Sequence, residues 1–164
     1  MDEVRNIRQK IEYDILSLAM AYMELDKKTR YYGTDVPIFY AEIHMLSTIA
    51  RHPGIHVGGL ADLLGITKGS VSEIIKKLER KALVLKETDH HNLSKLSLWL
   101  TEKGEKAHRN HMRYHAILNG IVEDELKTAS AHDVEFLSHF LSAIASTLVS
   151  KREEFDESME HIEK

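Results

Sequence analysis

The stretch at residues 66–84, which reads ITKGSVSEIIKKLERKALV, constrains the fold more than any other part of the chain. Its apolar residues recur at spacings of three and four, as they do on the buried face of a helix. They are Val71, Ile74, Ile75 and Leu78. The opposite face has small and hydroxyl residues at its start and cations toward its end. Thr67 precedes the first turn, where its hydroxyl can cap the helix.

A second, shorter helix is predicted just before this one, at residues 58–65. Its leucines, Leu60, Leu63 and Leu64, are expected to face inward, and Gly65 suits the left-handed residue that ends a helix. Two helices joined by so short a turn form a helix-turn-helix, whose second helix enters the major groove of DNA. An ordinary helical hairpin would also explain the turn. The segment that follows distinguishes it from a DNA-binding helix-turn-helix.

The segment at residues 83–101 favours DNA binding. Apolar residues alternate at both of its ends, and the polar run at 88–92 lies between them, which predicts a β-hairpin. A hairpin after the second helix is the wing of a winged helix. We therefore expect DNA contacts from both the second helix and the wing. The predicted residues are Thr67, Lys68, Ser70, Ser72, Glu73, Lys76, Lys77, Arg80, Asn92 and Lys95.

The order and spacing of these pieces resemble the MarR family of winged-helix transcriptional regulators. The resemblance covers residues 38–126 and includes the LTEKG motif at 100–104. It implies a mainly α fold of the α+β winged-helix type, with long N- and C-terminal dimerisation helices. The whole chain, residues 1–164, would form a single MarR-like domain. Within it, residues 1–35 and 104–155 would be dimerisation helices, 38–101 the winged helix-turn-helix, and 156–164 a frayed tail.

The wing departs from the family pattern. The family usually has a D-x-x-D-R-R-like run in the wing, whereas residues 89–94 here read DHHNLS. The arginine that the resemblance would place in the minor groove is therefore missing. Either Lys95 replaces it, or the wing contributes less binding energy than it does in relatives.

Long amphipathic helices are predicted on both sides of the winged segment. The first spans residues 4–31 and ends near Gly33, the next spans 40–50, and a long one spans 101–127. Ser130 and Asp133 form a capping pair for a last helix. The apolar stripes of these helices exceed what a small winged domain can cover, so we expect a homodimer. Its two recognition helices would bind a palindromic, double-stranded operator.

Composition narrows the function further. The chain has no cysteine, which excludes disulfides and a thiol-based sensor. Its net charge is −4, but residues 66–86 contain six cations and two acids. This segment can therefore bind DNA phosphates although the chain as a whole is acidic. No apolar run is long enough to span a bilayer, and no charged-then-apolar leader is present. We expect a cytoplasmic protein without membrane contacts.

The count of eleven histidines says little by itself, but the positions of three of them suggest a metal site. His111 and His115 are one helical turn apart, and two imidazoles at that spacing can bind one metal ion. His44 lies beside buried positions of an earlier helix, and Glu24 lies near the end of the first helix. These donors suit zinc or a similar divalent ion. Alternatively, the histidines fill polar positions at a dimer interface.

Within the MarR family, the chain resembles the zinc-responsive repressors of metal-uptake genes. Their two helix histidines follow the threonine that closes the wing by ten and fourteen residues, as His111 and His115 follow Thr101 here. Their earlier histidine follows a polar residue by two, as His44 follows Glu42. The resemblance implies zinc, or another divalent transition metal, as co-repressor. It leaves open whether Glu24 or Asp26 is the carboxylate ligand. A second metal site of those proteins is not reproduced, because Ile43 and Asn110 replace its ligands.

Two other functions were weighed against a metal-responsive regulator. A metal-dependent hydrolase would need a glutamate directly after the first histidine to activate water, and Met112 occupies that place. We therefore predict that the chain is not an enzyme. A regulator released from DNA by a small aromatic or lipid effector remains open, since four tyrosines are available to line a cleft. They are Tyr22, Tyr31, Tyr32 and Tyr40.

Overall fold

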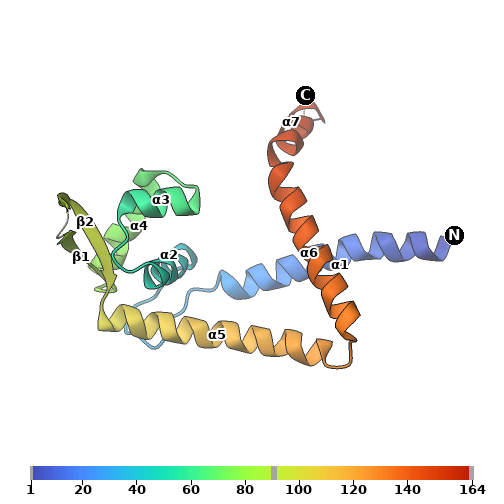
Figure 1. The fold of residues 1–164 in the computed structure, drawn as a ribbon, viewed down its shortest axis with the longest axis horizontal. Helices are drawn as coiled ribbons and strands as arrows, with labels where there is room; N and C mark the ends of the chain where they lie inside the picture. The colour runs from blue at the N-terminus through green and yellow to red at the C-terminus, as the bar shows by residue number, and fades with distance from the viewer. Residues whose placement is uncertain (1, 90–91, 163–164) are drawn as a thin grey trace. The chain divides into compact units, whose positions relative to one another are not determined.

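A computed structural model describes residues 2–89 and 92–162 (Figure 1). The fold is mainly helical with one two-stranded antiparallel sheet, as predicted. Two compact units result, one ending at His115 and one beginning at Ala116. The elements are α1 (Asp2–Asp26), α2 (Tyr40–Arg51), α3 (Val57–Leu64), α4 (Lys68–Arg80), β1 (Val84–Asp89), β2 (Asn92–Leu100), α5 (Glu102–Leu126), α6 (Ala131–Ser150) and α7 (Arg152–Ile162).

The core of the first unit lies between α2, α3, α4 and the hairpin, with α2 and α3 both packed against α4. Of the four residues predicted to face inward on α4, Val71, Ile75 and Leu78 are fully buried and Ile74 is half-buried. Full burial of such a side chain contributes about 1.5–3 kcal/mol. The fully buried apolar residues are Ile38, Ile43, Leu46, Ile49, Leu60, Val71, Ile75, Leu78, Leu83, Leu98 and Ala107.

The helix-turn-helix forms at the predicted positions. Gly65 ends α3 in the left-handed conformation with a φ of 63°, and the Thr67 hydroxyl accepts a hydrogen bond from the backbone N–H of Ser70 at 3.1 Å. One detail of α3 is wrong. Leu63 and Leu64 are 52% and 39% exposed, because the buried face of this short helix runs through Leu60 and Ala61 in its middle and does not extend to its last turn.

The wing is an antiparallel hairpin, as predicted. Val84 pairs with Leu100 and Thr88 with Leu96, and the register shifts between Thr88 and Asp89. The predicted tip residues 90 and 91 lie outside the described part of the chain. The hairpin therefore begins within the core, where Val84 is buried, and extends away from it.

Helix α1 ends earlier than predicted, at Asp26 rather than near Gly33. Arg30 and Ile38 exchange backbone hydrogen bonds at 2.8 and 3.2 Å, which forces the chain at Arg30 out of the helix. Tyr32 and Gly33 then reverse the chain with φ values of 46° and 75°. The consequence is that Asp26 lies at the end of a helix and close to α2.

The described residues of the second unit form helices joined by short turns. The predicted cap of α6 is confirmed, since Ser130 and Asp133 exchange side-chain to backbone hydrogen bonds at 3.2 Å. Residues 152–162, which include most of the predicted frayed tail, form α7. Its sequence, REEFDESMEHI, contains several good helix formers, and Lys151 pairs with Glu154 at 3.4 Å. No described helix is long and apolar enough to cross a membrane.

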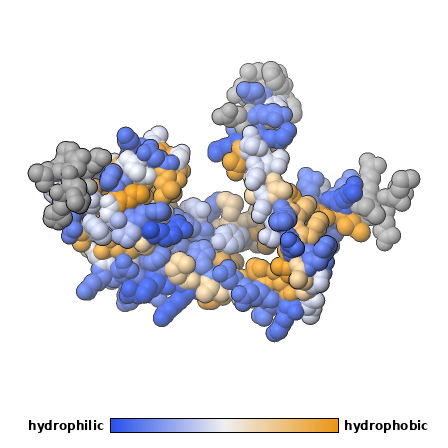
Figure 2. All heavy atoms as spheres, viewed as in Figure 1, coloured by the Kyte–Doolittle hydropathy of each residue, from blue (hydrophilic) through white to orange (hydrophobic). Residues whose placement is uncertain are grey.

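The terminal helices expose much apolar surface in the single chain, as the hydrophobic residues visible along them in Figure 2 show. On α1, Ile7 and Leu18 are 55% and 65% exposed. On α6, no described residue is buried, and Leu148 is 67% exposed. These helices therefore carry the apolar stripes predicted for them, without a cover inside their own unit.

Candidate functional site

The outer face of α4 carries the predicted DNA-reading residues. Because Val71, Ile75 and Leu78 point into the core, the opposite side of the helix is presented to solvent. Seven of the eight predicted residues from Thr67 to Arg80 are exposed, and Ser72 is half-buried. The structure thus brings these side chains together on one accessible surface.

Hydrogen bonds at the start of α4 distinguish its two serines. The Ser70 and Thr67 hydroxyls lie 2.9 Å apart at the exposed helix end. The Ser72 hydroxyl instead donates to the Lys68 carbonyl at 2.8 Å. Ser70 therefore has the more accessible hydroxyl, while that of Ser72 would have to leave an intrahelical bond before it donates elsewhere.

The cations near α4 fall into two groups. Lys81 and Lys86 are held in ion pairs with Glu42 and Glu79, at 2.5 and 2.7 Å. Four other cations make no ion pair with any described residue, and all four are predicted DNA contacts. They are Lys68, Lys76, Lys77 and Arg80. The positive charge of this segment is therefore concentrated on the outer face of α4.

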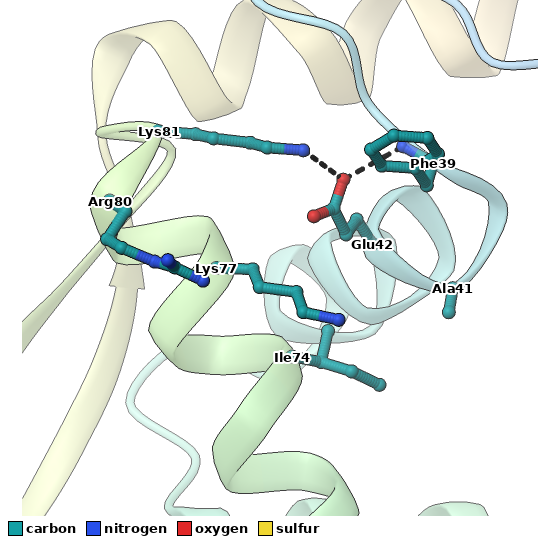
Figure 3. A pocket seen from close by; sticks show the side chains of 7 residues that line it. All are labelled: Phe39, Ala41, Glu42, Ile74, Lys77, Arg80 and Lys81. Atoms are coloured by element: carbon teal, nitrogen blue, oxygen red, sulfur yellow. Dashed lines mark hydrogen bonds and ion pairs between the residues drawn. The ribbon is translucent and has the colours of Figure 1, made fainter.

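The Glu42–Lys81 pair joins α2 to the end of α4 (Figure 3). Glu42 is 3% exposed and also accepts a hydrogen bond from the Phe39 backbone N–H at 2.8 Å. Lys81 in turn donates to the Pro37 carbonyl at 2.8 Å. The two helices are thus fixed to each other by a buried polar contact that sequence analysis did not find, since Glu42 and Lys81 are far apart in the chain.

The two predicted wing contacts are only partly located. Asn92 and Lys95 lie on β2, the second strand of the hairpin. Their side chains fall outside the described part of the structure, so their contribution to DNA binding stays a prediction.

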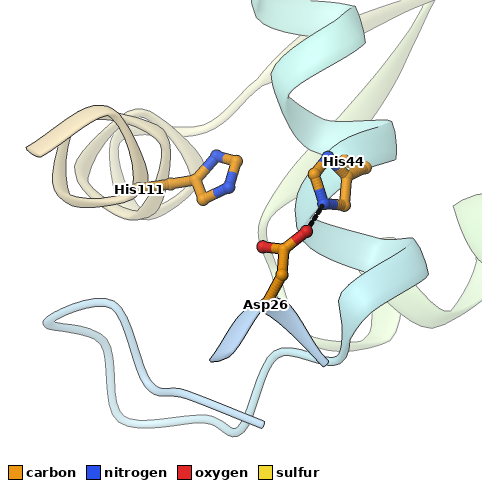
Figure 4. A group of neighbouring side chains, drawn as sticks. All are labelled: Asp26, His44 and His111. Atoms are coloured by element: carbon orange, nitrogen blue, oxygen red, sulfur yellow. Dashed lines mark hydrogen bonds and ion pairs between the residues drawn. The ribbon is translucent and has the colours of Figure 1, made fainter. Parts of the chain in front are cut away.

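Three predicted metal-binding segments meet in the first unit (Figure 4). Asp26 at the end of α1, His44 on α2 and His111 on α5 each offer one donor atom, and these atoms lie within 4.8 Å of one another. His44 Nε2 is 3.1 Å from Asp26 Oδ2. Asp26 and His111 are 5% and 2% exposed, which is low for polar side chains unless they have partners.

His115 lies beside His111, one turn further along α5. Its Nε2 is 3.1 Å from the Nε2 of His111, although it does not belong to the mutually close group of three. Ligands of a tetrahedral zinc ion at about 2.0–2.1 Å are about 3.3 Å from each other. The His111–His115 and Asp26–His44 separations are both near that value, so two pairs of donors already have a spacing that suits zinc.

A second observation, on one oxygen of Asp26, also favours a metal ion at these residues. Asp26 Oδ1 is buried and has no hydrogen-bond partner among the described residues. A buried carboxylate oxygen without a partner is unfavourable unless it meets a cation or a donor. Three imidazoles and one carboxylate are a ligand set typical of zinc.

Glu24, the first choice for the carboxylate ligand, is not brought to this site. It is exposed, whereas the alternative, Asp26, is buried beside His44. Two residues along a helix correspond to a rotation of about 200°, so the two carboxylates point in nearly opposite directions. Because α1 ends at Asp26, the last residue of the helix is the one that reaches α2.

The site favours neutral imidazole at His111. Burial, followed by the neighbouring His115 and His44, lowers the pKa of His111 from 6.5 to about 4. Its ring is therefore uncharged near neutral pH, as metal ligation requires. Burial, with a smaller contribution from Asp26, also raises the pKa of Tyr22.

Two residues near the candidate metal ligands were not predicted from the sequence. The Ser47 hydroxyl is 2.9 Å from His111 Nδ1 and 3.2 Å from His108 Nδ1. Together with His44, Arg51 and His115, these residues line a cavity of about 220 Å³. A spacing signal existed, because Ser47 follows His44 by three residues and His108 precedes His111 by three.

Comparison with known proteins agrees with this architecture. A sequence model described as MarR family matches residues 38–91. The HTH-type transcriptional regulator YhjH of Bacillus subtilis is 29% identical over 109 residues, which cover 66% of this chain and 62% of that protein. FabT of Streptococcus pneumoniae, solved in complex with DNA, has a TM-score of 0.71 at 22% identity, with 87% of this chain and 98% of that chain covered. The zinc-responsive MarR family member ZitR of Lactococcus lactis has a TM-score of 0.67 at 19% identity, with coverages of 87% and 99%.

The fold and the α4 surface define a winged helix-turn-helix protein. The MarR family model matches this winged segment, residues 38–91, so the chain is similar to MarR family winged-helix regulators. The matched relatives are transcriptional regulators rather than enzymes, which agrees with the prediction made from the missing catalytic glutamate.

Proposed function

We propose that this chain is a MarR family regulator that binds a double-stranded operator as a homodimer and represses transcription, with zinc or a similar divalent ion as co-repressor. The cationic outer face of α4 supports DNA binding, because four side chains there are available to phosphates. The structural similarity to FabT, solved with DNA, agrees with this use of the fold.

The exposed terminal helices support the homodimer. Residues such as Leu18 and Leu148, 65% and 67% exposed, are unfavourable in water when they form continuous stripes. A second copy of the chain is the natural partner, because a two-fold dimer presents two recognition helices to successive major grooves. The operator would then be palindromic.

The observation that carries the metal proposal is the meeting of Asp26, His44 and His111, with His115 3.1 Å from His111. These residues come from the end of α1, from α2 and from α5. The similarity to zinc-responsive ZitR favours zinc as the ion. An ion bound by all four would fix the angle between these helices.

The Glu42–Lys81 pair provides a route from such a site to DNA. His44 and Glu42 are on the same helix, and Glu42 holds the end of α4 through Lys81. A change in the position of α2 would therefore move the recognition helix. We expect the two recognition helices of the dimer to have two spacings in equilibrium. A bound ion shifts that equilibrium only by the difference in its affinity for the two spacings. Operator DNA must then change the affinity for the ion by the same factor as the ion changes the affinity for DNA.

A direct test is zinc titration of the purified protein, combined with sedimentation to measure its oligomeric state. One zinc ion per chain and a dimer at micromolar concentration are expected. His44→Ala should remove this zinc binding and leave the dimer intact. A monomeric chain, or a His44→Ala variant that binds zinc as tightly as wild type, would contradict the proposal.

An organic effector is the second candidate function. A cavity of about 440 Å³ lies beside α4, lined by Phe39, Ile74, Lys77 and Arg80 and by the Glu42–Lys81 pair (Figure 3). An aromatic acid would find an apolar surface and cations there. A screen of aromatic acids for release of DNA from the zinc-free protein tests this candidate.

A further inference from the structure

Ser47 lies between two histidine rings. Its Oγ is 2.9 Å from His111 Nδ1 and 3.2 Å from His108 Nδ1. Ser47 is 6% exposed, and its hydroxyl has no other partner among the described residues. A hydroxyl has a single proton to donate, so the proton positions on the two rings are linked through it.

Only two directions of donation satisfy all three groups when both rings are neutral. In the first, His111 Nδ1–H donates to Ser47, and the Ser47 hydroxyl donates to His108 Nδ1. In the second, His108 Nδ1–H donates to Ser47, and Ser47 donates to His111 Nδ1. The first direction leaves a lone pair on His111 Nε2, and the second places a proton there.

His111 Nε2 is the nitrogen that faces the other ligands, since it lies 3.1 Å from His115 Nε2. Metal ligation needs the lone pair on this atom, and ligating histidines generally donate their other ring N–H to a fixed acceptor. The first direction is therefore the one that prepares His111 for an ion. In this direction His108 is not a ligand, because a neutral ring that accepts at Nδ1 carries its proton on Nε2.

We propose that Ser47 and His108 are positioning residues that hold His111 in the Nδ1-protonated tautomer, with the Nε2 lone pair directed toward His115 and the ion. The inference deepens the proposed function and rests on it for the identity of the ligand. In this arrangement the Ser47 hydroxyl donates its proton to Nδ1 of His108. The His108 side chain is half-buried and lines the same cavity as the candidate metal ligands.

The first measurement needs no metal. Nitrogen-15 NMR of the histidine rings in the full-length, zinc-free protein at pH 8 reports which nitrogen of each ring carries the proton. Wild type should show His111 protonated at Nδ1 and His108 protonated at Nε2. Ser47→Ala should lose this preference at His111. An unchanged His111 tautomer in Ser47→Ala would overturn the proposal.

The second measurement is zinc affinity, with variants that separate positioning from folding. Ser47→Ala and His108→Leu should each weaken zinc binding by roughly 10–100-fold, the usual effect of losing a partner of a ligand. His108→Asn keeps an acceptor in place of Nδ1 and should restore affinity to within about threefold of wild type. Equal affinities for His108→Leu and wild type would contradict a role for His108.

The two measurements keep this inference distinct from the proposed function. If the His111 tautomer depends on Ser47 but wild type does not bind zinc, the tautomer assignment stands and the co-repressor proposal fails. If wild type binds zinc and Ser47→Ala binds it equally well with an unchanged tautomer, the proposed function stands and the positioning role fails.

Discussion

Lowering the pH from 7 to 5 should destabilise the zinc-free protein through His111. Its side chain is 2% exposed, and burial lowers its pKa from 6.5 to about 4. As the pH falls, the unfolded chain therefore binds a proton before the folded chain does. The contribution of the buried, uncharged His111 ring to the free energy of unfolding is therefore fully present above pH 6.5, and it is lost as the pH falls toward 4. Linkage between these two pKa values gives a loss of about 2 kcal/mol between pH 7 and pH 5.

Urea unfolding, followed by the fluorescence of the single tryptophan, Trp99, measures this loss. Chelator and a fixed protein concentration are needed, because zinc and dimerisation both shift apparent stability. His111→Gln removes the titrating ring and should reduce the loss by about 2 kcal/mol. His132→Gln is the matched control, since the His132 side chain is 89% exposed, and it should behave like wild type. A parallel loss in wild type and His111→Gln would refute the reasoning.

Three further predictions concern the ligands, the DNA surface and the contact between α2 and α4. Asp26→Asn should weaken zinc binding by more than roughly 100-fold, which is the largest usual effect of losing a partner of a ligand. Glu24→Gln should bind zinc as wild type does in the same titration. A larger loss in Glu24→Gln than in Asp26→Asn would exclude Asp26 as a ligand. Lys76→Ala should weaken operator and random duplex about equally and reduce the salt slope of log K by about 1, so a selective loss of operator binding would contradict a phosphate contact. Glu42→Gln should lower the free energy of unfolding by about 2 kcal/mol through the weakened bond to Lys81, and an unchanged value would show that the pair contributes nothing.

The DNA-binding half of the fold was predictable because its signals are local. The spacing of Val71, Ile75 and Leu78, the cap at Thr67 and the glycine at Gly65 each determine structure within one or two turns. Their agreement with one another made the helix-turn-helix recognisable. The structure places each of these residues as the sequence predicted.

The end of α1 was not predictable in this way. Residues 27–31 continue a helical pattern in the sequence, but the backbone pairing of Arg30 with Ile38 overrides it. The choice between Glu24 and Asp26 depends on that pairing, so it could not be made from spacing alone. The same limit explains Leu63 and Leu64, whose apolar character says nothing about how far the core extends beneath α3.

The residues around the candidate metal ligands were not predictable for another reason. Ser47 is not a residue type that commonly binds metals, so its place in the sequence carries no signal of such a role. His108 was one of many histidines in the chain, and its role depends on a partner far away in sequence. Residues that orient a metal ligand can be identified only from the structure, where the helices that carry them pack together.

In the proposed function, metal binding and DNA binding are coupled through the site at His111. The most direct test is the affinity of the purified protein for a duplex selected from a random library, measured by fluorescence anisotropy with zinc and with chelator. Zinc should tighten binding by about 5–150-fold for wild type and should leave the weaker binding of His111→Ala unchanged. Zinc affinity measured with and without the duplex should change by the same factor. Equal DNA affinities with and without zinc for wild type, or a full zinc response in His111→Ala, would contradict the account.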